Sequence, residues 1–247
     1  TRTRRRVVTA AVEPAPRAGV LPYLAAFAVL VLGWGFSSVQ AAFPSEPAQS
    51  VVQLVVKLVT MVLLPGWLFL RLRLGTRARL PAARLLAVFA VMGLAYLALQ
   101  VAFGRGLTTL AAVSPSVLTL AWALPACLAW QTLEAGLCEE VLFRRIVQER
   151  LAATLRSPVA AVAWTSLLFG LAHAPGLLLR GGDAMEGVAQ ASPAWAVAYS
   201  IVMIAPAGIA FGVLWVRTRS LWLLVPLHGL VDLLPQLAPF IRAWSGT

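Results

Sequence analysis

The hydrophobic positions of this chain are grouped into seven long stretches, separated by short joins that contain Pro, Gly and Arg. The stretches cover residues 19–43, 48–70, 81–103, 107–132, 158–179, 194–216 and 220–241. An α-helix needs about 20 apolar residues to cross the roughly 30 Å hydrocarbon core of a bilayer, and each stretch is of that order. The pattern therefore predicts an all-α, polytopic transmembrane helix bundle.

Residues 133–155 depart from this pattern because they combine apolar positions with the densest charge in the chain. We expect an amphiphilic helix there, either a cytoplasm-side continuation of the preceding span or a partly buried helix. The prediction is seven crossings plus this helix, thus seven to eight helices, with a polar cavity between the later ones.

The composition agrees with a lipid environment. Hydrophobic residues make up 60% of the chain and charged residues only 12%, whereas soluble domains average about 25% charged residues. A net charge of +11 would suit a nucleic-acid partner, but the basic residues lie in short clusters between apolar runs. Such clusters are typical of juxtamembrane anchors. The expected partner is the lipid bilayer, and no nucleic acid.

The basic clusters also predict the orientation of the chain. They lie at residues 2–6, 71–84, 144–156 and 217–219, and the positive-inside rule then puts the N-terminus in the cytoplasm. Abundant Ala and a single Lys indicate a bacterial host, hence its cytoplasmic membrane. Residues 1–18 are interpreted as a basic cytoplasmic tail and 19–106 as N-terminal transmembrane helices. A signal peptide that ends near Ala41 is the alternative interpretation of the start.

Six ionisable residues lie inside or beside the apolar stretches, where each costs roughly 2.5–3.5 kcal/mol on insertion scales. They are Glu134, Glu139, Glu140, Asp232 and both histidines of the chain, His173 and His228. Such groups usually face a bundle interior and act there. All six fall within residues 107–241, which we therefore interpret as the domain that carries the chemistry. Lys57, in the middle of another stretch, either snorkels or pairs with a carboxylate.

Spacing divides these residues into three groups. Glu140 and Arg144 are i,i+4 and can pair on one helical face, which leaves Glu139 free to point elsewhere. Phe169 and His173 are one helical turn apart, and Pro175 predicts that the helix ends or kinks at Ala174, with His173 beside a cavity.

In the third group, His228 and Asp232 are i,i+4 and can share a hydrogen bond. A zinc site is disfavoured because no His-Glu-x-x-His segment is present and Arg144 would repel a cation. The prediction includes no metal and no cofactor. The sequence also lacks the Gly-x-Ser-x-Gly elbow of serine hydrolases and the second buried Asp that aspartyl chemistry needs.

The motifs Glu-Glu-x-x-x-Arg, Phe-x-x-x-His and His-x-x-x-Asp, in this order, resemble the CAAX protease and bacteriocin-processing family, also called the Abi family, of intramembrane glutamic endopeptidases. The resemblance implies a metal-independent peptidase in which Glu139 and His173 activate a water. It implies that His228 and the residue at position 232 stabilise the oxyanion, and that Glu140 and Arg144 orient the site. Phe169 is expected to contact substrate or to support the site.

One position departs from the family pattern, because Asp232 stands where the family often has Asn. An ionised Asp would repel an oxyanion, so Asp232 is either protonated or orients His228 as an imidazolium donor. We favour the second, since a charged His is the stronger donor.

The expected function is hydrolysis of a peptide bond in a membrane-tethered or membrane-spanning protein, with bacteriocin-type peptides and C-terminal sorting anchors among the candidate substrates. A non-catalytic membrane scaffold or immunity protein is one alternative. A proton-coupled transporter that uses the buried carboxylates is another, although it predicts inverted repeats, which the sequence does not show.

Overall fold

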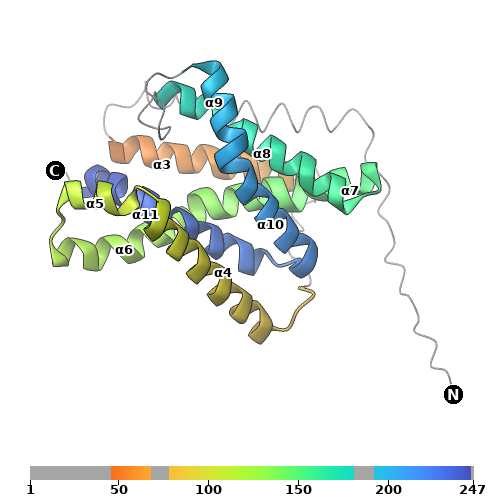
Figure 1. Ribbon diagram of the computed structural model, residues 1–247, viewed down its shortest axis with the longest axis horizontal. Coiled ribbons are helices and arrows are strands. Elements are labelled where there is room, and N and C mark those ends of the chain that lie inside the picture. The colour runs from red at the N-terminus through yellow and green to blue at the C-terminus, as the bar shows by residue number, and fades with distance from the viewer. Residues whose placement is uncertain (1–45, 68–77, 181–191, 246–247) are drawn as a thin grey trace.

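The computed structural model describes residues 46–67, 78–180 and 192–245, and the statements below refer to these ranges. Every regular element within them is helical (Figure 1). The elements are α3 (Glu46–Lys57), η2 (Leu58–Leu63), α4 (Ala82–Phe103), α5 (Gly106–Val113), α6 (Val117–Gln131), η4 (Thr132–Leu137), η5 (Glu140–Gln148), α7 (Glu149–Leu155), α8 (Pro158–Arg180), α9 (Pro193–Tyr199), η7 (Ser200–Ile204), α10 (Ala205–Thr218) and α11 (Leu221–Ser245), where η denotes a π-helical segment. The predicted tail over 1–18, the span over 19–43 and the signal-peptide alternative lie outside the described residues.

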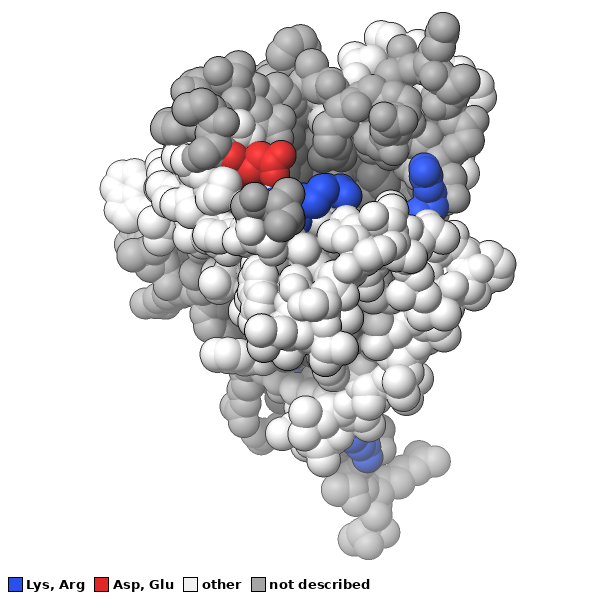
Figure 2. All heavy atoms as spheres, turned by 90° about the vertical axis from the view of Figure 1, so that its left-hand side faces the viewer, with Lys and Arg blue, Asp and Glu red and all other residues white. Residues whose placement is uncertain are grey.

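Several elements join end to end, so that the described ranges form seven continuous helices. This confirms the all-α bundle, and the helix count falls within the predicted seven to eight. Five helices are long and apolar enough to cross a membrane, namely Glu46–Leu63, Ala82–Phe103, Pro158–Leu178, Pro193–Thr218 and Leu221–Ser245. On the face shown in Figure 2, the described residues are almost all uncharged, as lipid contact requires.

The predicted span over 107–132 is wrong as a single helix. The chain leaves α5 at Ser114, which has a left-handed backbone with φ 48°, and α6 starts after Ser116. Ser116 caps α6 by accepting a hydrogen bond from the Thr119 backbone N–H at 3.0 Å. Pro115 between the two serines lacks the N–H that a continuous helix would need. The Ser-Pro-Ser sequence therefore divides this stretch into two shorter helices.

The charged segment 133–155 continues α6 without a break through η4, η5 and α7. It is not among the five helices that could cross a membrane, in agreement with its interpretation as a continuation. Glu139 lies at the junction of the two π-helical segments η4 and η5. Such π-helical turns are rare and often occur at functional sites, because the wider turn re-aims the side chains.

Two glycines allow α11 to cross this long helix at close range. A Cβ at Gly136 would meet the Val225 carbonyl oxygen, and a Cβ at Gly229 would come within 2.7 Å of the Thr132 backbone nitrogen. Any larger side chain at these positions would push the two helices apart. The close crossing brings His228, next to Gly229, within reach of the carboxylates at 139 and 140.

Candidate active site

Glu140 is fully buried and joins two helices. Its Oε2 accepts a hydrogen bond from Arg144 Nε at 3.0 Å, as the i,i+4 spacing predicts. Its Oε1 lies 2.8 Å from His228 Nδ1 on α11. A carboxylate paired with Arg can only accept, so His228 Nδ1 carries a proton and donates it to Glu140. The buried carboxylate therefore fixes both the position and the tautomer of His228, which the sequence did not reveal.

Arg144 is also fully buried, and its two terminal nitrogens have no hydrogen-bond partner among the described residues. Its guanidinium carbon lies 5.0 Å from the centre of the Phe169 ring. This cation–π contact stabilises a buried charge that is only partly hydrogen-bonded. Phe169 thus supports the arginine, while its ring centre is 4.9 Å from that of His173 and 6.2 Å from that of His228.

His173 does not lie at a helix end, because α8 continues through Pro175 to Arg180. The expectation that the helix ends at Ala174 is therefore wrong. The ring nitrogen Nδ1 of His173 lies 2.7 Å from the backbone carbonyl oxygen of Phe169. A carbonyl can only accept, so Nδ1 carries the proton and Nε2 of the neutral ring presents a lone pair.

Glu139 lies between the two histidines. Its Oε2 is 3.8 Å from His173 Nε2 and 3.8 Å from His228 Nε2. The Glu139 side chain is 5% exposed, and Oε2 has no hydrogen-bond partner among the described residues. A separation of 3.8 Å is too long for a direct hydrogen bond but suits two groups that share one small ligand. The offset of Glu139 from Glu140 predicted this division between the two carboxylates.

Asp232 lies at the edge of the same group. Its Oδ2 is 3.5 Å from His228 Nε2, and its side chain is 31% exposed, against 8% for His228. Glu140 lies closer to His228 than Asp232 does, since its Oε1 is 2.8 Å from the other ring nitrogen, Nδ1. The structure therefore brings all seven predicted site residues together, with Glu140 as the closest partner of His228.

Comparison with known families agrees with this geometry. The family model described as Type II CAAX prenyl endopeptidase Rce1-like matches residues 119–234, a range that contains all seven residues. The matched residues make up slightly less than half of the chain, and over them the chain is similar to that family. No curated protein and no solved structure matches the chain. The predicted resemblance to the CAAX protease family is confirmed, and the family together with the five apolar helices identifies a multi-pass membrane protein.

Two charged residues of the CAAX-protease-like site were not predicted as part of it. Lys57 on α3 forms an ion pair with Glu134 on η4, and its Nζ lies 3.5 Å from Glu139 Oε1. From the sequence, both stood out only as charges within apolar stretches. Of the two interpretations of Lys57, pairing is correct and snorkelling is not. Spacing gave no signal because Lys57 is 82 residues from Glu139.

A metal site finds no support in the described ranges, where no group of three or more His, Cys, Asp or Glu has an arrangement that could hold a metal ion. Glu140 instead accepts hydrogen bonds from Arg144 and His228. The arrangement of the site can remove a proton from a small ligand at Glu139 Oε2 and offer a donor from His228 on the same side.

Proposed function

We propose that the protein is an intramembrane endopeptidase that hydrolyses a peptide bond of a membrane-tethered or membrane-spanning protein or peptide. The observation that carries this proposal is the convergence of Glu139 Oε2 and His173 Nε2. Both are acceptors, and they face each other across 3.8 Å. A water molecule has two donor hydrogens and can satisfy both groups at once.

In the proposed reaction, the water oxygen attacks the scissile carbonyl carbon while Glu139 accepts one of its protons. The carbonyl π electrons move to the oxygen, and His228 stabilises this oxyanion by donating from Nε2. Collapse of the tetrahedral intermediate breaks the C–N bond, and the proton held by Glu139 passes to the leaving amine. The two products are a carboxylate and an amine, as in any hydrolysis by general acid–base catalysis.

The charges around His228 support its role as an imidazolium. Nδ1 donates to the buried Glu140, and Nε2 faces two further carboxylates, Glu139 at 3.8 Å and Asp232 at 3.5 Å. Negative groups on both sides favour a second proton on the ring. A charged donor at Nε2 stabilises a developing oxyanion more strongly than a neutral one.

The test is a cleavage assay in proteoliposomes with two quenched fluorescent probes. One probe ends in a farnesylated Cys-aliphatic-aliphatic-X tail, and the other is an unlipidated single membrane span with a short C-terminal tail. We expect wild type to cleave at least one of them, Glu139→Gln to abolish cleavage, and a metal chelator to leave it unchanged. The probe that is cleaved identifies the substrate class.

Three outcomes would contradict the proposal. Cleavage by Glu139→Gln at the wild-type rate would remove the assigned base. Inhibition by a chelator with rescue by zinc would indicate a metalloprotease. Cleavage of neither probe, together with proton flux through wild-type liposomes that Glu139→Gln stops, would favour the transporter alternative.

A further inference from the structure

The ion pair between Lys57 and Glu134 lies beside the proposed base but is partly outside the segment that the family model matches. Glu134 is within residues 119–234, whereas Lys57 comes from α3, more than 60 residues earlier. Lys57 is only 7% exposed although it lies in one of the five apolar helices. A lysine there is costly unless its ammonium is paired, and paired intramembrane charges usually serve a function.

The position of Lys57 is fixed by the packing of the residues that follow it and by its own ion pair. The following residues Met61 and Val62 of η2 belong to a buried cluster with Val141, Leu142 and Ile146 of η5. The ammonium itself is held by Glu134, one helical turn or so before Glu139 on the same long helix. α3 therefore carries its charge to a fixed point beside the carboxylate of Glu139.

The two oxygens of Glu139 have different neighbours. Oε1 faces the Lys57 ammonium at 3.5 Å, and Oε2 faces the two histidines at 3.8 Å each. A cation on one oxygen stabilises the ionised carboxylate and restricts its rotation. Oε2 is then left to receive the proton of the attacking water.

We propose that Lys57 is a positioning residue of the active site, which keeps Glu139 ionised and turned with Oε2 toward the histidines, and that Glu134 holds Lys57 in place. The consequence for rate rests on the proposed peptidase function, whereas the effect on Glu139 does not. Besides Lys57, the charged or titratable groups close to Glu139 are Glu134, Cys138, Glu140, Arg144, His173, His228 and Asp232. Loss of Lys57 leaves Glu139 among three other carboxylates.

The first measurement needs no substrate. Infrared difference spectra over a pH titration record the band of the protonated Glu139 carboxyl, which Glu139→Gln assigns by its disappearance. In Lys57→Met we expect the midpoint of this band to move upward by about 1–3 on the pH scale, because a nearby cation no longer favours the anion. Lys57→Arg keeps the charge, so its midpoint stays near that of wild type.

The variant Lys57→Met leaves the half-buried Glu134 without its cation and can fold poorly for that reason alone. The double variant Lys57→Met/Glu134→Gln removes both charges and keeps similar volumes. We expect the same upward movement of the Glu139 midpoint in this double variant. Arg242→Met is the matched control for loss of one cation, since Arg242 is exposed at the end of α11, and it leaves the midpoint unchanged.

Kinetics with the cleaved probe give the second measurement. The acid limb of kcat/KM moves to higher pH in Lys57→Met and in the double variant by the same amount as the infrared midpoint, and Lys57→Arg restores it. At a fixed pH well below the acid limb of wild type, kcat falls about tenfold for every 1.0 by which the limb has moved in pH, while KM changes little. A merely structural lysine would lower the amount of folded protein without moving this limb.

An unchanged infrared midpoint in the double variant overturns the role of Lys57, whatever the activity. Cleavage of neither probe by wild type, combined with a higher midpoint in the double variant, overturns the peptidase proposal and keeps the electrostatic role of Lys57. A higher midpoint with an unchanged acid limb would show that Lys57 controls the charge of Glu139 but that Glu139 is not the base.

Discussion

The long helix from α6 to α7 carries two clusters of charged side chains, which have the same arrangement of residues but differ in burial. In the inner cluster, Glu140 lies between Arg144, four residues away, and His228 of α11. In the outer cluster, Glu149 lies between Arg145, four residues away, and Arg219 at the end of α10. Each consists of a carboxylate between two basic side chains, one from its own helix and one from a distant helix.

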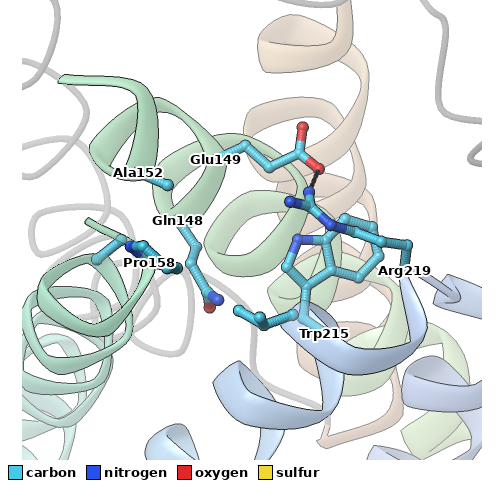
Figure 3. Close-up of a pocket in the computed structure, with 8 residues that line it drawn as sticks. Gln148, Glu149, Ala152, Pro158, Trp215 and Arg219 are labelled. Atoms are coloured by element: carbon cyan, nitrogen blue, oxygen red, sulfur yellow. Dashed lines mark hydrogen bonds and ion pairs between the residues drawn. The ribbon is translucent and has the colours of Figure 1, made fainter. Parts of the chain in front are cut away.

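Burial distinguishes the two clusters. The Glu140 and Arg144 side chains are 0% exposed, whereas those of Arg145, Glu149 and Arg219 are 17–30% exposed. Glu149 and Arg219 of the outer cluster line a small pocket together with Gln148 and Trp215, and Figure 3 shows the ion pair between them. Water and headgroups can solvate such charges, so pairing changes their energy little. In the inner cluster the charges are shielded from water, and this converts an ordinary i,i+4 pair into a rigid support for a histidine.

The strongest contrast between the clusters should appear in activity. Glu139→Gln, next to the inner cluster, removes the proposed base while keeping the volume, and we expect kcat to fall by about 10²–10⁴-fold. Glu149→Gln, in the outer cluster, should leave kcat within twofold or so of wild type, since its group has no part in the reaction. Turnover of the cleaved probe in proteoliposomes measures both, and equal losses in the two variants would remove the distinction.

Stability should separate the clusters next. Arg144→Met leaves Glu140 buried beside His228 without its arginine, and breaking a buried pair in this way costs about 3–5 kcal/mol. Arg145→Met breaks a pair of the same spacing in the outer cluster and should cost about 0–1 kcal/mol. Denaturant unfolding in detergent micelles, followed by tryptophan fluorescence, compares them. A loss for Arg144→Met below that for Arg145→Met would show that burial does not govern the two pairs.

Much of this arrangement could be predicted from the sequence, because helices are held by contacts between residues close in sequence and their residues recur on one face at regular intervals. The charges in apolar stretches identified Glu139, His173 and His228, and the i,i+4 rule identified the bond between Glu140 and Arg144. The tertiary pairings could not be predicted in this way. The bond from His228 to Glu140 spans 88 residues and depends on the close crossing at Gly136 and Gly229.

The errors have local causes that spacing alone does not weigh. Pro175 was expected to end or kink the helix at Ala174, but α8 continues through it to Arg180. Residues 107–132 were predicted to be one span because their composition is apolar throughout. The Ser-Pro-Ser sequence at 114–116 supplies both a stop and a cap, and these local signals prevail over the apolar composition.

A smaller effect is expected at Asp232, where the two partners of His228 can be compared. Asp232 faces Nε2 at 3.5 Å and is partly exposed, whereas Glu140 accepts from Nδ1 at 2.8 Å in full burial. Asp232→Asn should therefore lower kcat/KM by no more than about fivefold, which corresponds to about 1 kcal/mol. If this variant loses activity as completely as Glu139→Gln, the charge of Asp232 and not that of Glu140 keeps His228 protonated.

The smallest expected difference between the two clusters is in how salt changes the stability losses of their variants, which depends on whether water reaches the charges. Ions screen charges that water can reach, with a Debye length of about 10 Å at 0.1 M and about 3 Å at 1 M. The stability difference between wild type and Glu149→Gln should therefore shrink toward zero in 1 M salt. The difference between wild type and Arg144→Met should stay nearly constant, because ions do not enter the space around a fully buried guanidinium. Unfolding midpoints at the two salt concentrations measure this. A salt-independent loss in Glu149→Gln would mean that the outer cluster is shielded in the folded protein, and the contrast between the two clusters would then lie in their chemistry alone.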